Sequence, residues 1–65
     1  MGSGFYAQLR SVLIAHRCIL ARQGKGSHEV WFSPITQRTF AVAVTVNSRH
    51  TANEVLKQAG IDKRF

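Results

Sequence analysis

The spacing of hydrophobic residues predicts an amphipathic helix near the start of the chain, over residues 5–16. Apolar side chains recur there at intervals of three and four residues, which places them on one side of a helix. Ser3 precedes the segment and is a residue type that caps helices. We therefore expect one face of this helix to contact a core. That face consists of Phe5, Leu9, Val12, Leu13 and His16.

A second helix is predicted for residues 51–59 by signals at both of its ends. Thr51 and Glu54 have the spacing of a capping box, in which the two side chains satisfy N–H groups of the first turn. Gly60 follows the segment and is the residue type that commonly ends a helix, so that Ile61 can fold back on the last turn. The apolar side of the helix consists of Ala52, Val55, Leu56 and Ala59.

Three strands are predicted between the helices, over residues 17–23, 27–32 and 38–46. The last of them alternates large and small side chains, which is the period of a strand with one face buried. The large residues of this strand, expected to face the core, are Phe40, Val42, Val44 and Val46.

The middle strand has apolar residues on both of its faces, so its orientation is less obvious. Val30 and Phe32 share one face with His28, whereas Glu29 and Trp31 share the other. We expect Val30 and Phe32 to face the core. Trp31 then lies on the open face, and His28 reaches solvent only if it lies at the rim of the sheet or a bulge turns it outward.

The element order α-β-β-β-α, with short turns between the strands, predicts an α+β domain. We expect a three-stranded antiparallel sheet with both helices on one face, because one face of the third strand is apolar. The other face of the sheet stays open to solvent or to a partner. This is the arrangement of the double-stranded-RNA-binding domain. The chain of 65 residues is short enough that residues 1–65 are expected to form one domain.

The charge of the chain indicates a polyanionic partner. Nine Lys and Arg residues against three Asp and Glu residues give a net charge of +6, as is typical of proteins that bind nucleic acid, acidic proteins or anionic surfaces. No apolar run reaches the roughly 18 residues that span a bilayer, so a cytoplasmic protein is expected. Cys18 is the single cysteine and is expected to be buried. One cysteine and three dispersed histidines do not give four zinc ligands at the spacing of a structural site, so no metal site is expected.

The turn between the first two strands is the candidate site for an anionic ligand. It reads Gly-Lys-Gly-Ser-His over residues 24–28. Glycine allows the backbone to approach a ligand closely, and the N–H groups of Gly26 and Ser27 are suited to hold a phosphate. Lys25 adds positive charge, and His28 adds an imidazole at the start of a strand. The alternative interpretation is an ordinary basic hairpin turn.

Two segments of the chain carry a family pattern: Arg-Gln-Gly-Lys-Gly-Ser-His over residues 22–28 and Leu-Lys-Gln-Ala-Gly-Ile over residues 56–61. Both resemble the HicA-type toxins, which are mRNA interferases of bacterial toxin–antitoxin pairs. The length and the element order agree with the family over nearly the whole chain. Two places differ: Glu29 stands where the family often has a second histidine, and residues 44–47 replace a Val-Pro-X-His segment.

The resemblance implies a double-stranded-RNA-binding-like fold and cleavage of mRNA without a metal or another cofactor. It also implies neutralisation by a HicB-like antitoxin, with operator DNA contacted only through the antitoxin complex. The family's catalytic histidine corresponds to His28. We expect Lys25 and Arg22 to bind the phosphate and Gly26 and Ser27 to hold it, while Trp31 contacts a base or a protein partner.

Two alternatives remain at this point. The first is a non-catalytic module that binds double-stranded RNA. Such modules usually carry a lysine cluster at the start of the last helix, and here the first lysine of the predicted helix is Lys57. The second is a basic structural or interaction protein. The acid that would complete catalysis is also open, with Lys25, His50 and water as candidates.

Overall fold

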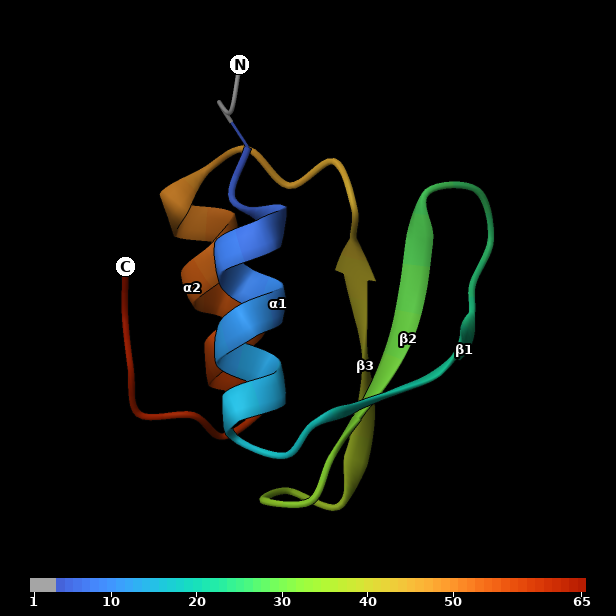
Figure 1. Ribbon diagram of the computed structural model, residues 1–65, viewed down its shortest axis with the longest axis vertical. Helices are drawn as coiled ribbons and strands as arrows, with labels where there is room; N and C mark the ends of the chain where they lie inside the picture. The colour runs from blue at the N-terminus through green and yellow to red at the C-terminus, as the bar shows by residue number, and fades with distance from the viewer. Residues whose placement is uncertain (1–3) are drawn as a thin grey trace.

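The computed structural model describes residues 4–65 and shows the elements in the expected order, α-β-β-β-α (Figure 1). The predicted element order and the antiparallel three-stranded sheet are therefore confirmed, with the strands arranged β1-β2-β3. Ser3, the predicted cap of the first helix, lies outside the described residues. The bounds are α1 Tyr6–Ala15, β1 Ile19–Gln23, β2 His28–Ser33, β3 Arg38–Ala43 and α2 Arg49–Gln58.

Both helices pack on one face of the sheet and lie side by side there, with β3 nearest to them and β1 farthest away (Figure 1). A single hydrophobic cluster joins the two helices to β2 and β3. All five residues of β1 are exposed, because neither helix extends over that edge of the sheet. The cluster consists of Leu9, Leu13, Cys18, Trp31, Phe40, Val42, Val46, Ala52, Val55, Leu56, Ala59 and Ile61.

The orientation of β2 is opposite to the sequence prediction. Trp31 is only 1% exposed and Glu29 is also buried, whereas Val30 and Phe32 are half-buried on the other face. The cause is the register of the β2–β3 hairpin, in which Trp31 lies opposite Phe40. Paired residues of antiparallel strands point to the same side of the sheet. Burial of Phe40 under the helices therefore buries Trp31 as well.

The polar residues on the buried face of β2 are accommodated by hydrogen bonds. Glu29 Oε1 accepts one bond from the Tyr6 hydroxyl at 2.7 Å and another from Trp31 Nε1 at 3.0 Å. Ser33 Oγ donates to the carbonyl oxygen of Ala59 at 2.6 Å. Buried polar groups are tolerated when they are paired in this way. The bonds of Tyr6 and Ala59 also connect β2 to both helices.

Helix α2 ends as predicted, in a Schellman motif. Gly60, with φ 77°, donates from its N–H to Lys57 O at 3.1 Å, and the N–H of Ile61 donates to Leu56 O at 2.9 Å. These bonds satisfy carbonyl groups of the last turn. Ile61 is 5% exposed and folds back on the core, as expected.

Helix α1 ends in the same motif, and this shortens the predicted first strand. Arg17 has φ 69° and donates to Ile14 O at 2.9 Å, while Cys18 donates to Leu13 O at 2.9 Å. The prediction that the strand starts at Arg17 is therefore wrong, because this residue terminates the helix. Cys18 is 3% exposed, which confirms its predicted burial.

The third strand ends earlier than predicted, and the second helix begins earlier than predicted. Strand β3 ends at Ala43, after which the chain turns and Val46 N–H donates to Ala43 O at 3.1 Å. Helix α2 begins at Arg49 rather than at Thr51, because Ser48 is the N-cap and accepts from the Thr51 N–H at 3.5 Å. The predicted capping box of Thr51 and Glu54 is therefore wrong.

Candidate functional site

The turn over residues 24–28 joins β1 to β2 and depends on its glycines. The Gly24 N–H donates to His28 O at 2.9 Å, and the His28 N–H donates to Lys25 O at 3.1 Å. A Cβ atom at Gly24 would lie 3.0 Å from His28 O. Gly26 has φ 62°, a conformation that residues with a side chain rarely adopt. The two glycines therefore keep this turn tight.

The backbone around His28 is held from both sides of the hairpin. Val44 N–H donates to Ser27 O at 2.9 Å, which ties the turn to the end of β3. The side chain of Gln23 donates from Nε2 to His28 O at 3.2 Å. These bonds restrain the backbone that carries the His28 side chain.

The imidazole of His28 lies on the open face of the sheet. His28 is paired with Ala43, while its neighbour Glu29 is paired with the buried Val42. Because neighbouring residues of a strand point to opposite faces, His28 points away from the helices. It is exposed, and the small side chain of Ala43 beside it leaves the ring accessible. The sequence did not determine whether His28 reaches solvent, and the β2–β3 register places it on the open face.

Arg22 and Lys25 bring positive charge to the same end of the hairpin. Arg22 is paired with Val30, so its side chain shares the face of His28. Lys25 is exposed within the turn. The backbone N–H groups of Gly26 and Ser27 donate to no other backbone group within residues 4–65. An anion at this end of the hairpin would therefore find both cations and free N–H donors.

Trp31 does not belong to this site, contrary to the sequence prediction. Its ring is buried against the helices, and its Nε1 donates to Glu29. Phe32, which the sequence analysis assigned to the core, lies on the open face instead. The sequence contained a signal for this orientation of β2. If four residues connect Ser33 to Arg38, these two residues are paired, and Trp31 then lies opposite Phe40.

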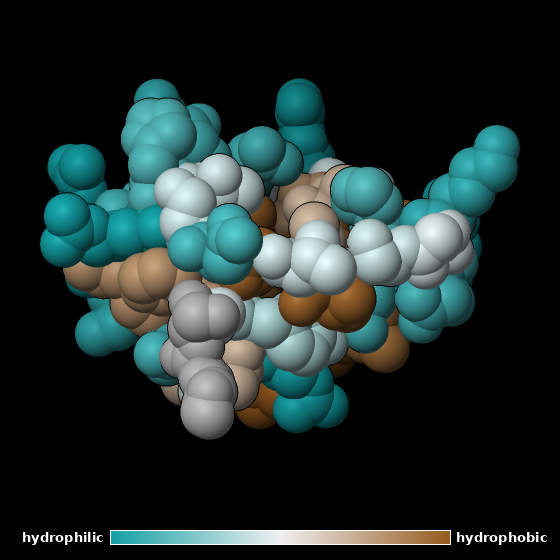
Figure 2. All heavy atoms as spheres, turned by 90° about the horizontal axis from the view of Figure 1, so that it is seen from above, coloured by the Kyte–Doolittle hydropathy of each residue, from teal (hydrophilic) through white to brown (hydrophobic). Residues whose placement is uncertain are grey.

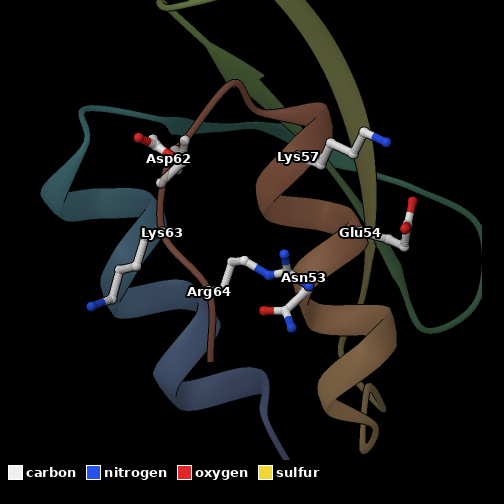
Figure 3. A pocket seen from close by; sticks show the side chains of 7 residues that line it. Asn53, Glu54, Lys57, Asp62, Lys63 and Arg64 are labelled. Atoms are coloured by element: carbon white, nitrogen blue, oxygen red, sulfur yellow. The ribbon is translucent and has the colours of Figure 1, made fainter.

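The acidic residues lie away from the open face of the sheet. Glu29 is buried toward α1, and Glu54 and Asp62 line a groove of about 330 Å³ between α2 and the C-terminal segment (Figure 3). The groove also contains Lys57, Lys63 and Arg64, so it has charges of both signs. In the view from above, hydrophilic side chains project around the edges of this end of the molecule, and near-neutral and hydrophobic residues lie between them (Figure 2).

Two groups outside the turn, Cys18 and Tyr6, have pKa values above their ordinary ones. Burial raises the pKa of the Cys18 thiol, and the hydrogen bond with Ser33 opposes this effect. Burial raises the pKa of Tyr6 as well, and the hydrogen bond to Glu29 adds to the increase. Both groups are therefore protonated at neutral pH, and neither reaches the open face.

The remaining candidates lie elsewhere. His50 is exposed in the first turn of α2 and not in a loop, so it belongs to a different element from His28. His16 caps the end of α1, where its Nδ1 lies 2.9 Å from Val12 O. Within residues 4–65, no three side chains of the metal-binding types gather, and no helix is long and apolar enough to cross a bilayer.

Comparison of the chain with family models, curated proteins and solved structures found no match. The hairpin brings together Arg22, Lys25, Gly26, Ser27 and His28, which are five of the six residues assigned to the site from the sequence.

Proposed function

We propose that this chain is an endoribonuclease toxin of the HicA type, with a double-stranded-RNA-binding-like fold, that cleaves mRNA without a metal ion. The observation that carries the proposal is the exposed imidazole of His28 on the open face of the sheet, beside Arg22 and Lys25. An exposed histidine at the same end of the hairpin as two cations suits a phosphodiester substrate. The resemblance of residues 22–28 and 56–61 to the family supports the same assignment.

The proposed reaction uses the 2′-OH of RNA as the nucleophile. His28 accepts the proton of this hydroxyl, and its oxygen forms a bond to the adjacent phosphorus. The bond from phosphorus to the 5′-oxygen breaks, which yields a 2′,3′-cyclic phosphate and a 5′-OH. Lys25 and Arg22 stabilise the charge that builds on the phosphoryl oxygens. The 5′-oxygen takes a proton from Lys25 or water, since His50 lies on α2 and His28 points away from the helices.

The cellular context of this proposal is the cytoplasm, with mRNA as substrate and a HicB-like antitoxin as protein partner. Because the open face is basic, an antitoxin that covers His28 needs an acidic contact surface. Association of such a pair slows as salt is added. An association rate independent of salt would argue against this electrostatic interpretation.

A non-catalytic module that binds double-stranded RNA is the second candidate, and one observation favours it. Helix α2 begins at Arg49, so its first turn carries the exposed side chains of Arg49 and His50. Modules of this kind contact phosphates from the start of their last helix. Because the helix begins at Arg49, a basic residue lies in its first turn, whereas a helix that began at Thr51 would have none there.

Cleavage of mRNA by the purified chain in the presence of EDTA tests the proposal. We expect His28→Ala to reduce the cleavage rate by about 10²–10⁴, the usual contribution of a positioned acid or base. His16→Asn is the matched control, because it removes an imidazole at the end of α1, and it should cleave at the wild-type rate. Circular dichroism should show both variants folded.

Two results would decide against the proposal. Equal cleavage by wild type and His28→Ala would exclude His28 as the catalyst. Absence of cleavage, together with tight binding of duplex RNA, would favour the second candidate. Products that end in a 2′,3′-cyclic phosphate would support the stated reaction.

A further inference from the structure

A row of side chains leads along the open face of β2 from His28 to Phe32. His28, Val30 and Phe32 point outward in sequence, and successive members of the row lie roughly 6.6–6.8 Å apart, twice the rise of a strand residue. On the β3 side they are paired with small residues, namely Ala43, Ala41 and Thr39. Beside His28, the sheet therefore offers a shallow strip with an aromatic ring at its far end.

Strand β1 forms the other border of this strip. Arg22 lies opposite Val30, and Ile19 lies opposite Phe32. The register shifts between Leu20 and Arg22, which leaves Ala21 unpaired in a bulge. Without this bulge, Leu20 would lie opposite Phe32. Ile19 is 58% exposed and Phe32 is half-buried, so the ring of Phe32 lies next to an apolar side chain and remains partly accessible.

The charges around the strip are of one sign. Arg22 lies on this face, Lys25 lies in the adjoining turn, and the chain's three acidic residues lie elsewhere. A ligand on the strip would therefore meet an aromatic ring and positive charge together. Folds that bind single-stranded nucleic acid combine these two features, with bases stacked on rings and the backbone held by cations.

We propose that Phe32 and Arg22 form a binding subsite for single-stranded RNA, in which a base stacks on the Phe32 ring and a phosphate contacts Arg22. The subsite rests on the proposed function, since it would bind the part of the RNA that leads to His28. Duplex RNA does not fit it, because paired bases remain stacked on one another and do not present their faces to a side chain. The subsite thus makes single-stranded segments of mRNA the substrate.

Binding is best measured with the full chain carrying His28→Ala, so that RNA is not cut during titration. The probe is a fluorescein-labelled single-stranded RNA of about 12 nucleotides of mixed sequence, within the usual range of site sizes, compared with the duplex of the same sequence. Fluorescence anisotropy gives the two affinities. We expect the single strand to bind more tightly than the duplex.

Added to this background, Phe32→Leu removes the ring but keeps an apolar side chain next to Ile19. We expect about a tenfold loss of affinity for the single strand, equivalent to about 1.4 kcal/mol. Phe32→Tyr keeps the ring and should bind like the parent. Ile14→Leu is the matched control, since Ile14 is an exposed apolar residue of α1, 48% exposed, and it should not change binding.

The role of Arg22 is tested through salt. Arg22→Gln should reduce the slope of log affinity against log salt by about one, the effect of one lost phosphate contact. Lys57→Gln removes a cation from the groove beside α2 and should leave the slope unchanged. This measurement keeps the proposal testable if Phe32→Leu fails to fold, which circular dichroism would reveal.

Tighter binding of the duplex, or equal affinities of Phe32→Leu and the parent, would overturn the subsite. Unchanged RNA binding in a Phe32→Leu variant that loses an acidic protein partner would also overturn it and would assign the strip to that partner. If the wild type cleaves RNA through His28 but Phe32→Leu binds normally, only the subsite fails. If no cleavage occurs while binding depends on Phe32, only the proposed function fails.

Discussion

The hydroxyl of Tyr6 donates a hydrogen bond to Glu29 Oε1 at 2.7 Å and so joins α1 to β2. Glu29 follows His28 directly and points to the opposite face of the sheet. The carboxylate that the sequence places next to the candidate catalyst is therefore turned away from the proposed RNA site. Its negative charge is buried with Tyr6 and Trp31 and not presented to a polyanion.

Removal of the Tyr6 hydroxyl should destabilise the fold without changing its shape. We expect Tyr6→Phe to lower the free energy of unfolding by about 2 kcal/mol, since hydrogen bonds to charged groups contribute about 1.5–3 kcal/mol. Urea denaturation followed by circular dichroism measures the change. In a double-mutant cycle with Glu29→Ala, which removes the acceptor, a coupling free energy near zero would show that the bond contributes nothing.

The same bond predicts how stability depends on alkaline pH. The pKa of Tyr6 is raised above its ordinary value of 10.0, first by burial and then by the bond to Glu29. Because the folded pKa exceeds the unfolded one, the stabilisation by protonated Tyr6 is complete below the unfolded pKa and is lost as pH rises through the folded pKa. Urea denaturation on both sides of about pH 10 should show a smaller alkaline loss for Tyr6→Phe than for wild type. Parallel curves for the two proteins would contradict this.

Ser33 provides the corresponding link to α2. Its hydroxyl donates to Ala59 O at 2.6 Å and accepts from the Ile35 N–H at 3.2 Å, and it is fully buried. Ser33→Ala leaves these groups without their partner and should cost about 1–3 kcal/mol. Ser11→Ala, on the exposed side of α1, should change stability by less than about 0.5 kcal/mol. Equal melting temperatures for the two variants would refute the role of Ser33.

Arg17 occupies a position that favours glycine, and this offers a stabilising substitution. Its φ of 69° is left-handed, which costs residues with a side chain about 1–2 kcal/mol. We expect Arg17→Gly to raise the free energy of unfolding by about 0.5–1 kcal/mol after the greater entropy of unfolded glycine is subtracted. Arg17→Gln removes the charge but keeps the strained conformation, so thermal denaturation should show no gain. A gain in both variants would attribute the effect to charge.

Much of the candidate site was predictable because its signals are local. The glycines and the cations of residues 22–28 are adjacent in the sequence, and a hairpin turn keeps them together in space. The order of the elements followed from hydrophobic periodicity, and the end of α2 followed from Gly60 and Ile61. The start of α2 could not be predicted from the sequence, because Ser48 and Thr51 are both capping residue types and only the fold selects between them.

The sequence by itself thus determined the elements, their order and the composition of the turn, since each depends on residues close together in the chain. Only the tertiary structure decided which face of β2 is buried. A period of two separates Glu29 and Trp31 from Val30 and Phe32, but it does not say which set faces the core. That choice came from pairing with β3 and from the bond that Tyr6 of α1 donates to Glu29, and it leaves His28 and Phe32 on the open face.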